Sequence, residues 1–114
     1  MKEIKRLLAT KELVDSASQI LDVRSPFEWD DTGVIAGCKK VSLYNDDGLM
    51  NENFVSEVDD LGFNKDEPLY VICHSGVRSQ AAAQILARVG FKEPVSLDGG
   101  VAKLGVDGYE FSKE

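Results

Sequence analysis

The chain has 114 residues, of which 43% are apolar and 29% are charged; this is typical of one soluble globular domain, so we expect a single monomeric domain over residues 1–114. Its formal net charge of −7 argues against nucleic acid or an anionic membrane as the main partner, because both attract clustered Lys and Arg. No apolar run approaches the roughly 18 residues of a membrane span, and residues 1–17 lack the long apolar core of a signal peptide, which favours a cytoplasmic protein.

The first part of the chain predicts two strands with a helix between them. Residues 4–8 predict a short strand, and Thr10 is placed to be the N-cap of a helix over residues 11–17. Residues 19–23, QILDV, then predict a buried strand because the run is mostly apolar and β-branched.

The next segment predicts a capped helix and a third strand. In residues 25–31, Ser25 stands at the N-cap and Pro26 at the first helical position, with Glu28 at the third. A glutamate there can complete a capping box. Glycines interrupt the chain after this helix, and residues 39–43 predict another strand.

The second half of the chain carries the strongest signals. A helix is predicted over residues 51–63, with one apolar face made by Phe54, Val55, Val58 and Leu61. Residues 69–72 are continuously apolar, as in a central parallel strand. Residues 77–91 predict the longest helix, which Gly90 ends. Residues 93–100 predict a last strand with a glycine turn, and a short helix and tail follow.

Strand and helix alternate about five times along the chain, which predicts an α/β fold with a parallel sheet and helices on both faces. In such sheets ligands bind at the carboxyl ends of the strands, often where the next helix begins. Cys73 stands at that place after the strongest strand.

The loop that follows this strand has the residues of a thiol-based site. A thiol is a nucleophile only as the thiolate, and backbone N–H groups at a helix start favour the anion. Gly76 permits a tight turn that aims several amides inward. Arg78 adds a permanent positive charge, which either binds an anionic substrate or braces the loop through its carbonyls. We therefore expect Cys73 to be a catalytic nucleophile in an anion-binding loop.

The other loop residues have supporting roles. His74 is the only histidine, and we favour an exposed residue that tunes specificity over a proton-transfer role. Ser75 and Ser79 can donate hydrogen bonds to a bound anion, although Ser79 can equally satisfy its own helical turn. Val77 completes the loop. Two cysteines and one histidine are too few for a zinc site without carboxylates, so we expect neither a metal nor another cofactor.

Several segments together resemble the rhodanese family of sulfurtransferases, over roughly residues 4–108. They are LDVRSPFEW (21–29), GVIAGCKKVSL (33–43), YVICHSGVRSQAAAQILARVGF (70–91) and LDGGVAKL (97–104). The resemblance implies the rhodanese-like fold, a small five-stranded parallel sheet with helices on both faces. It also implies that the Cys73 thiolate takes the outer sulfur of a donor such as thiosulfate and holds it as a persulfide. A thiophilic acceptor, such as cyanide or a cellular thiol, then removes that sulfur.

The resemblance also assigns roles outside the loop. Asp22 and Arg24 match the family's Asp-x-Arg element, and we expect Asp22 to brace the site. Arg24 is expected to form an ion pair with Glu28 that places the next loop, and only secondarily to belong to the substrate rim. The implied partners are small sulfur donors and thiol acceptors, with a sulfur-carrier protein as a further candidate.

Roles can also be predicted for two aromatic residues of the 25–31 segment and for the second cysteine. Phe27 and Trp29 are expected to cover the core, and Trp29 is also a candidate for lining the site entrance. For Cys38 we favour a small buried residue. The alternative is a resolving thiol that attacks the Cys73 persulfide or forms a disulfide, which requires Cα atoms within roughly 7 Å.

Two rival functions are consistent with a thiol in such a loop. Cysteine-based phosphatases and arsenate reductases place one residue more between the cysteine and the arginine, whereas four separate Cys73 from Arg78. The shorter loop favours attack on sulfur over phosphate. A module that only docks a partner or relays sulfur is the second rival. His74 and Ser75 also stand where thiosulfate-specialised relatives carry basic residues, so we expect thiosulfate to be a poor or merely convenient donor.

Overall fold

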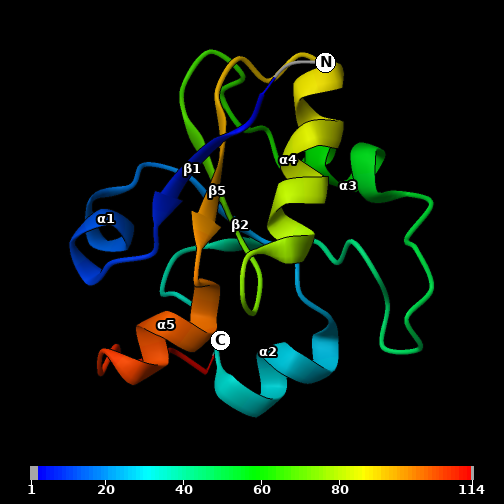
Figure 1. The fold of residues 1–114 in the computed structure, drawn as a ribbon. Helices are drawn as coiled ribbons and strands as arrows, with labels where there is room; N and C mark the ends of the chain where they lie inside the picture. The colour runs from blue at the N-terminus through cyan, green and yellow to red at the C-terminus, as the bar shows by residue number, and fades with distance from the viewer. Residues whose placement is uncertain (1–2, 114) are drawn as a thin grey trace.

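Parallel strands form the centre of the computed structural model, which describes residues 3–113 (Figure 1). Within that range a five-stranded sheet has the order β1-β5-β4-β2-β3, and every pair of neighbours is parallel. The strands are β1 (Lys5–Leu8), β2 (Ile20–Asp22), β3 (Lys39–Lys40), β4 (Leu69–Ile72) and β5 (Pro94–Asp98). The predicted fold class is confirmed, with β4 at the middle of the sheet.

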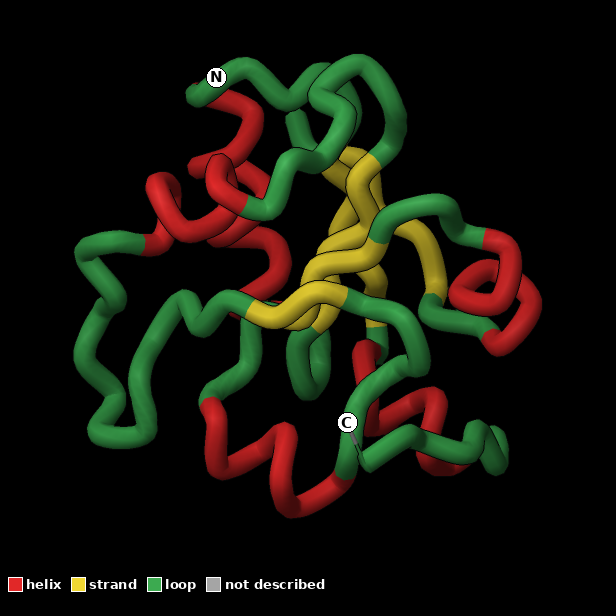
Figure 2. Tube along the Cα trace, turned by 180° about the vertical axis from the view of Figure 1, so that it is seen from behind, coloured by secondary structure: helices red, strands yellow, loops and turns green. Residues whose placement is uncertain are grey.

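Helices cover both faces of this sheet (Figures 1 and 2). They are α1 (Lys11–Ser16), α2 (Pro26–Thr32), α3 (Phe54–Asp60), α4 (Val77–Arg88) and α5 (Gly100–Val106). One hydrophobic cluster joins α3 and α4 to the sheet, and a second joins α1 and α5 to its other face. None of the helices in residues 3–113 is long and apolar enough to cross a membrane.

The two faces follow from the alternation of side chains along a strand. In β4, Val71 points into the cluster under α3 and α4, whereas Ile72 points into the cluster under α1 and α5. Cys73 follows on the same face as Val71. The nucleophile candidate is therefore held against the start of α4.

Local capping signals predicted the starts of α1 and α2 correctly. Thr10 Oγ1 accepts the Leu13 N–H at 3.1 Å. Ser25 and Glu28 form the expected capping box at the start of α2, with Pro26 in the first turn. These contacts satisfy amides that have no acceptor within the helix.

Three details of the prediction are wrong. The helix expected over residues 51–63 is only Phe54–Asp60, because the Asn51 side chain instead holds a turn by accepting the Asn53 N–H. Val55 of its expected apolar face is 38% exposed. The strand expected over residues 39–43 is a two-residue ladder. Phe27 is 66% exposed rather than part of the core, while Trp29 does pack against the second cluster.

Candidate active site

The candidate nucleophile lies at the carboxyl end of the central strand. Cys73 directly follows β4, and α4 begins at Val77, so residues 73–76 form the whole connection. The side chain of Cys73 is only 1% exposed. Its sulfur therefore lies in a confined space next to the first turn of a twelve-residue helix.

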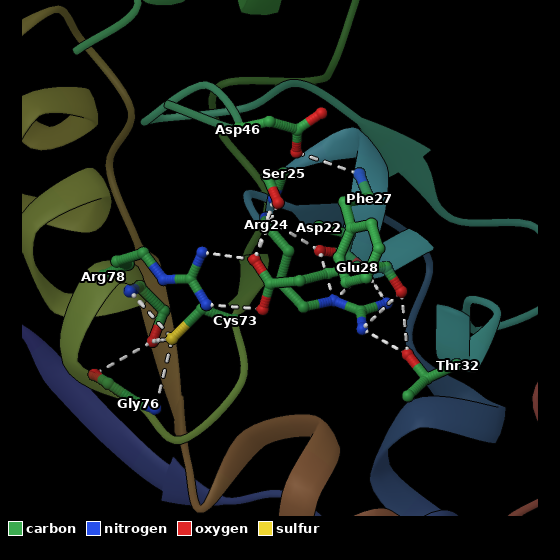
Figure 3. Close-up of polar contacts among 11 residues, drawn as sticks. Asp22, Arg24, Ser25, Phe27, Glu28, Thr32, Asp46, Cys73, Gly76 and Arg78 are labelled. Carbon is green, nitrogen blue, oxygen red and sulfur yellow. Dashed lines mark hydrogen bonds and ion pairs between the residues drawn. The ribbon is translucent and has the colours of Figure 1, made fainter. Parts of the chain in front are cut away.

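The sulfur is surrounded by hydrogen-bond donors (Figure 3). The Gly76 N–H donates to Cys73 Sγ at 3.1 Å, and the Ser79 N–H donates to it at 3.3 Å. The thiol itself donates to Ser79 Oγ, with sulfur and oxygen 3.5 Å apart. Backbone donors at a helix start stabilise negative charge, so both N–H groups are placed to stabilise charge that develops on the sulfur.

Gly76 is the residue that lets the loop turn toward the sulfur. Its φ is +116°, in a region that residues with a Cβ avoid. A Cβ there would meet ordinary contacts, the nearest being Asp98 Cα at 3.6 Å. The backbone dihedral, and not lack of space, is therefore what requires glycine.

The loop rests on the junction between β5 and α5. Three amides of that junction donate to three consecutive loop carbonyls: Val101 N–H to Cys73 O at 3.0 Å, Ala102 N–H to His74 O at 2.9 Å, and Gly99 N–H to Ser75 O at 3.2 Å. Gly100 lies so close that a Cβ would come within 2.4 Å of the Cys73 carbonyl oxygen. The sequence analysis did not anticipate this support, although the paired glycines were its visible signal.

A buried pair of hydroxyls lies behind the sulfur. Ser79 Oγ donates to the Gly76 carbonyl at 3.1 Å and lies 2.7 Å from Ser96 Oγ on β5. Both serines are fully buried. Ser79 thus satisfies its own helical turn and contacts the thiol at once. Ser96 was missed, and its signal was a serine inside an otherwise apolar strand.

Arg78 is held by a carboxylate from another helix. Its Nη1 and Nη2 donate to Glu28 Oε1 and Oε2 at 2.7 and 2.8 Å (Figure 3). Hydrogen bonding from Arg78 is the largest influence that lowers the pKa of Glu28 to about 2, and the bond from the Ser25 amide adds to it. The same pair raises the pKa of Arg78. Of the two expected alternatives for Arg78, bracing through the loop carbonyls is wrong, because its partner is Glu28; binding of a substrate anion stays a prediction.

The expected ion pair between Arg24 and Glu28 is wrong. Arg24 is paired with Asp22, whose Oδ2 accepts from Arg24 Nη2 at 2.8 Å, and both side chains are 1% exposed. Arg24 also donates to Thr32 Oγ1 and to the Gly33 carbonyl, both at 2.7 Å. It reaches only the backbone carbonyl of Glu28, at 3.4 Å. The buried pair therefore anchors α2 to β2 and lies behind the rim.

Of the remaining candidate residues, three lie on the exposed side of the loop, and the second cysteine lies on the other face of the sheet. His74, Ser75 and Val77 are exposed, with Val77 at 75%. Cys38 is 9% exposed and belongs to the cluster on the opposite face of the sheet from Cys73. The sheet thus separates the two thiols, which argues against a resolving role for Cys38.

Among residues 3–113, no group of three or more His, Cys, Asp and Glu is placed to hold a metal ion.

Comparison with protein families gives a match over nearly the whole chain. The model of the family described as "Rhodanese-like domain" matches residues 1–105. A thiosulfate sulfurtransferase GlpE of Ectopseudomonas mendocina is 34% identical over 102 residues, covering 88% of this chain and 84% of that protein. The GlpE of Vibrio cholerae is 42% identical over 52 residues. That second match spans about half of each protein, 46% of this chain and 47% of the relative.

Solved structures show the same architecture. A rhodanese-related protein of Thermoplasma volcanium has a TM-score of 0.67 at 26% identity, covering 90% of each chain. A rhodanese-like domain protein of Staphylococcus aureus has a TM-score of 0.71 at 24% identity, covering 96% of this chain and 99% of that one. At that lower identity the likeness concerns the fold alone.

Proposed function

Because the chain belongs to the rhodanese-like domain family, we propose that it is a sulfurtransferase working through a persulfide on Cys73. It moves sulfane sulfur from a donor such as thiosulfate to a thiophilic acceptor such as cyanide or a cellular thiol. The proposal rests on the environment of Cys73 Sγ. This atom is buried at the carboxyl end of the central strand, and two backbone N–H groups donate hydrogen bonds to it. The naming of the GlpE relatives as thiosulfate sulfurtransferases supports the same reaction.

The first half-reaction loads the enzyme. The Cys73 thiolate attacks the outer sulfur of thiosulfate and forms a new S–S bond. The sulfur–sulfur bond of the donor breaks, and sulfite departs with the electron pair. The Gly76 and Ser79 amides lie 3.1 and 3.3 Å from Sγ, so they stabilise the attacking thiolate and the thiolate that later leaves.

The second half-reaction transfers the outer sulfur of the Cys73 persulfide to the acceptor. Cyanide, or an acceptor thiolate, attacks the outer sulfur of the Cys73 persulfide, and the bond between the two sulfurs breaks. The electron pair returns to Cys73, and thiocyanate or a new persulfide departs. Donor and acceptor thus react in turn with one residue, which predicts ping-pong kinetics.

The partners proposed for this reaction are small sulfur donors and thiol acceptors, with a sulfur-carrier protein as a further acceptor. We place the activity in the cytoplasm, in a monomer, with no role for nucleic acid or membrane. The exposed side chains of Phe27 and Val77, 66% and 75% accessible, support an acceptor that brings its own apolar surface to the loop.

Mass spectrometry of the protein tests the proposal directly. After incubation with a donor, we expect one added sulfur atom on Cys73 that cyanide removes, with thiocyanate as the product. Cys73→Ala abolishes the added mass. Cys38→Ala is the matched control, because it removes a thiol on the opposite face of the sheet and leaves Cys73 in place.

Two outcomes would contradict the proposal. One is hydrolysis of an aryl phosphate that depends on Cys73 without any persulfide, which would favour the phosphatase alternative. The other is a persulfide that forms but never turns over with cyanide or thiols, which would favour a relay or docking module.

A further inference from the structure

We propose that Glu28 determines which sulfur donors the site accepts. By neutralising Arg78, it disfavours the thiosulfate dianion and leaves the site better suited to organic persulfides, R–S–SH. The inference rests on the proposed function and names its substrate class. The observation behind it is that neither arginine of the site offers an uncompensated positive charge to a substrate.

The Arg78–Glu28 contact is geometrically complete. Both terminal nitrogens of Arg78 are used, one on each carboxylate oxygen of Glu28. Glu28 is fixed in turn by Ser25, whose N–H and Oγ both donate to Oε1 at 3.1 Å. The two side chains are 25% and 27% exposed, so water screens them only in part. The N–H donors of Arg78 that Glu28 leaves unused can still reach a substrate anion, but that anion would lie beside the Glu28 carboxylate and meet an already compensated charge.

Arg24 cannot substitute for Arg78. It is almost fully buried, and Asp22 already pairs with it at 2.8 Å. Its remaining donors are directed at Thr32 and at the Gly33 carbonyl. Figure 3 shows the two arginine–carboxylate pairs side by side, on the same flank of Cys73.

Thiosulfate and organic persulfides differ in the charge that they bring to this site. Thiosulfate brings two negative charges toward a thiolate and leaves as the sulfite dianion, so every step places like charges together. A protonated persulfide brings none. Cys73 attacks its outer sulfur, the S–S bond of R–S–SH breaks, and R–S⁻ departs with the electron pair while the proton stays on the transferred sulfur. Repulsion between like charges is strong in a partly dehydrated site.

The exposed side chains beside the Arg78–Glu28 pair are also suited to an organic donor. Phe27, next to Glu28 in α2, is 66% exposed, and Val77, next to Arg78 in α4, is 75% exposed. Apolar side chains flank the ion pair on both elements, where carbon atoms of R can contact them. Thiosulfate has no such atoms.

Glu28→Gln tests the inference with little disturbance, because Gln also completes a capping box. We expect the KM for thiosulfate to fall about three- to tenfold as Arg78 is released, corresponding to roughly 1 kcal/mol. The change lies in KM rather than kcat. The ratio of kcat/KM for thiosulfate to kcat/KM for cysteine persulfide rises by a similar factor. Asp31→Asn is the matched control, because it removes the same charge from an exposed position of α2.

The double variant Glu28→Gln/Arg78→Gln distinguishes the inference from direct anion binding. If Glu28 already compensates Arg78, removing both returns the KM for thiosulfate to about the wild-type value. If Arg78 binds thiosulfate in the wild-type enzyme, the double variant shows a KM far above wild type, and the inference is wrong.

The salt dependence of the wild-type enzyme gives a second measurement that needs no variant. Added salt leaves its KM for thiosulfate flat or lowers it, whereas a steep rise with salt would show a free cationic site.

Failure of the inference is distinguishable from failure of the proposed function. If neither donor adds sulfur to Cys73, the proposed function is wrong. If both donors load Cys73 but Glu28→Gln leaves their ratio of kcat/KM unchanged, the sulfurtransferase stands and only the role of Glu28 is overturned.

Discussion

Gly100→Ala is the sharpest perturbation that the structure offers, because it displaces the active-site loop without touching a side chain of the site. A Cβ at this position would lie 2.4 Å from the Cys73 carbonyl oxygen and 2.6 Å from that of His74. Ordinary contacts begin at 3.4 Å, so the overlap is 3.4 − 2.4 = 1.0 Å. Both atoms belong to the backbone and cannot rotate away. The loop and α5 must therefore move apart.

The cost has three sources. The φ of +54° at Gly100 adds about 1 kcal/mol of backbone strain for alanine. Overpacking adds about 1–3 kcal/mol. Weakening the Val101 and Ala102 hydrogen bonds to loop carbonyls, at 3.0 and 2.9 Å, adds about 1 kcal/mol each. We expect the free energy of unfolding to fall by about 4–6 kcal/mol, which is comparable to the whole stability of a marginally stable domain.

Activity falls further than stability alone requires. The displaced loop carries the Gly76 amide away from Cys73 Sγ, and a shift of about 1 Å in a reacting group costs on the order of 100-fold in rate. Urea denaturation and the rate of persulfide formation measure the two effects. Gly105→Ala is the matched control in the same helix, since its Cβ meets nothing closer than Phe111 at 3.9 Å. It should stabilise the helix by about 0.5–1 kcal/mol. A Gly100→Ala protein as stable and as fast as wild type would refute the reasoning.

Three further predictions concern polar groups around the site. When Cys73 attacks as the anion, the Ser79 hydroxyl can turn from the Gly76 carbonyl to Sγ while Ser96 donates to Ser79, so Ser96→Ala should slow persulfide formation about fivefold. A rate equal to that of the wild type contradicts this. Arg24→Gln leaves a buried carboxylate unpaired, so urea denaturation should show a loss of about 3–5 kcal/mol, and a loss near zero contradicts it. Since the pKa of Glu28 is lowered from 4.5 to about 2, its stabilisation is complete above pH 4.5 and is lost as pH falls through 2. The deficit of Glu28→Gln, about 1 kcal/mol at pH 7, should therefore vanish near pH 2 in acid denaturation, and a deficit that persists there would contradict the assignment.

Local signals allowed most of the fold to be predicted from sequence, and long-range contacts account for what was missed. The strand before Cys73 was predicted because a continuous apolar run is a local property, and so was the capping box of Ser25 and Glu28. Glu28 was assigned to Arg24 because they are four residues apart, whereas its true partner is 50 residues away in the chain. Ser96 was missed for the same reason. Its contact with Ser79 depends on how α4 packs over β5, which no local pattern records.

The position of Arg78 connects the length of the loop to the charge of the site. With only residues 73–76 between β4 and α4, Arg78 falls in the first turn of the helix, and its guanidinium extends toward α2 and Glu28 (Figure 3). Glu28 is already oriented there by the α2 capping box. The short loop therefore does more than leave less room than a phosphatase loop: it places the arginine where a preformed carboxylate compensates it. On the proposed function, the short loop disfavours phosphate and the compensated arginine disfavours dianions, so both features point to the uncharged sulfur donors inferred above.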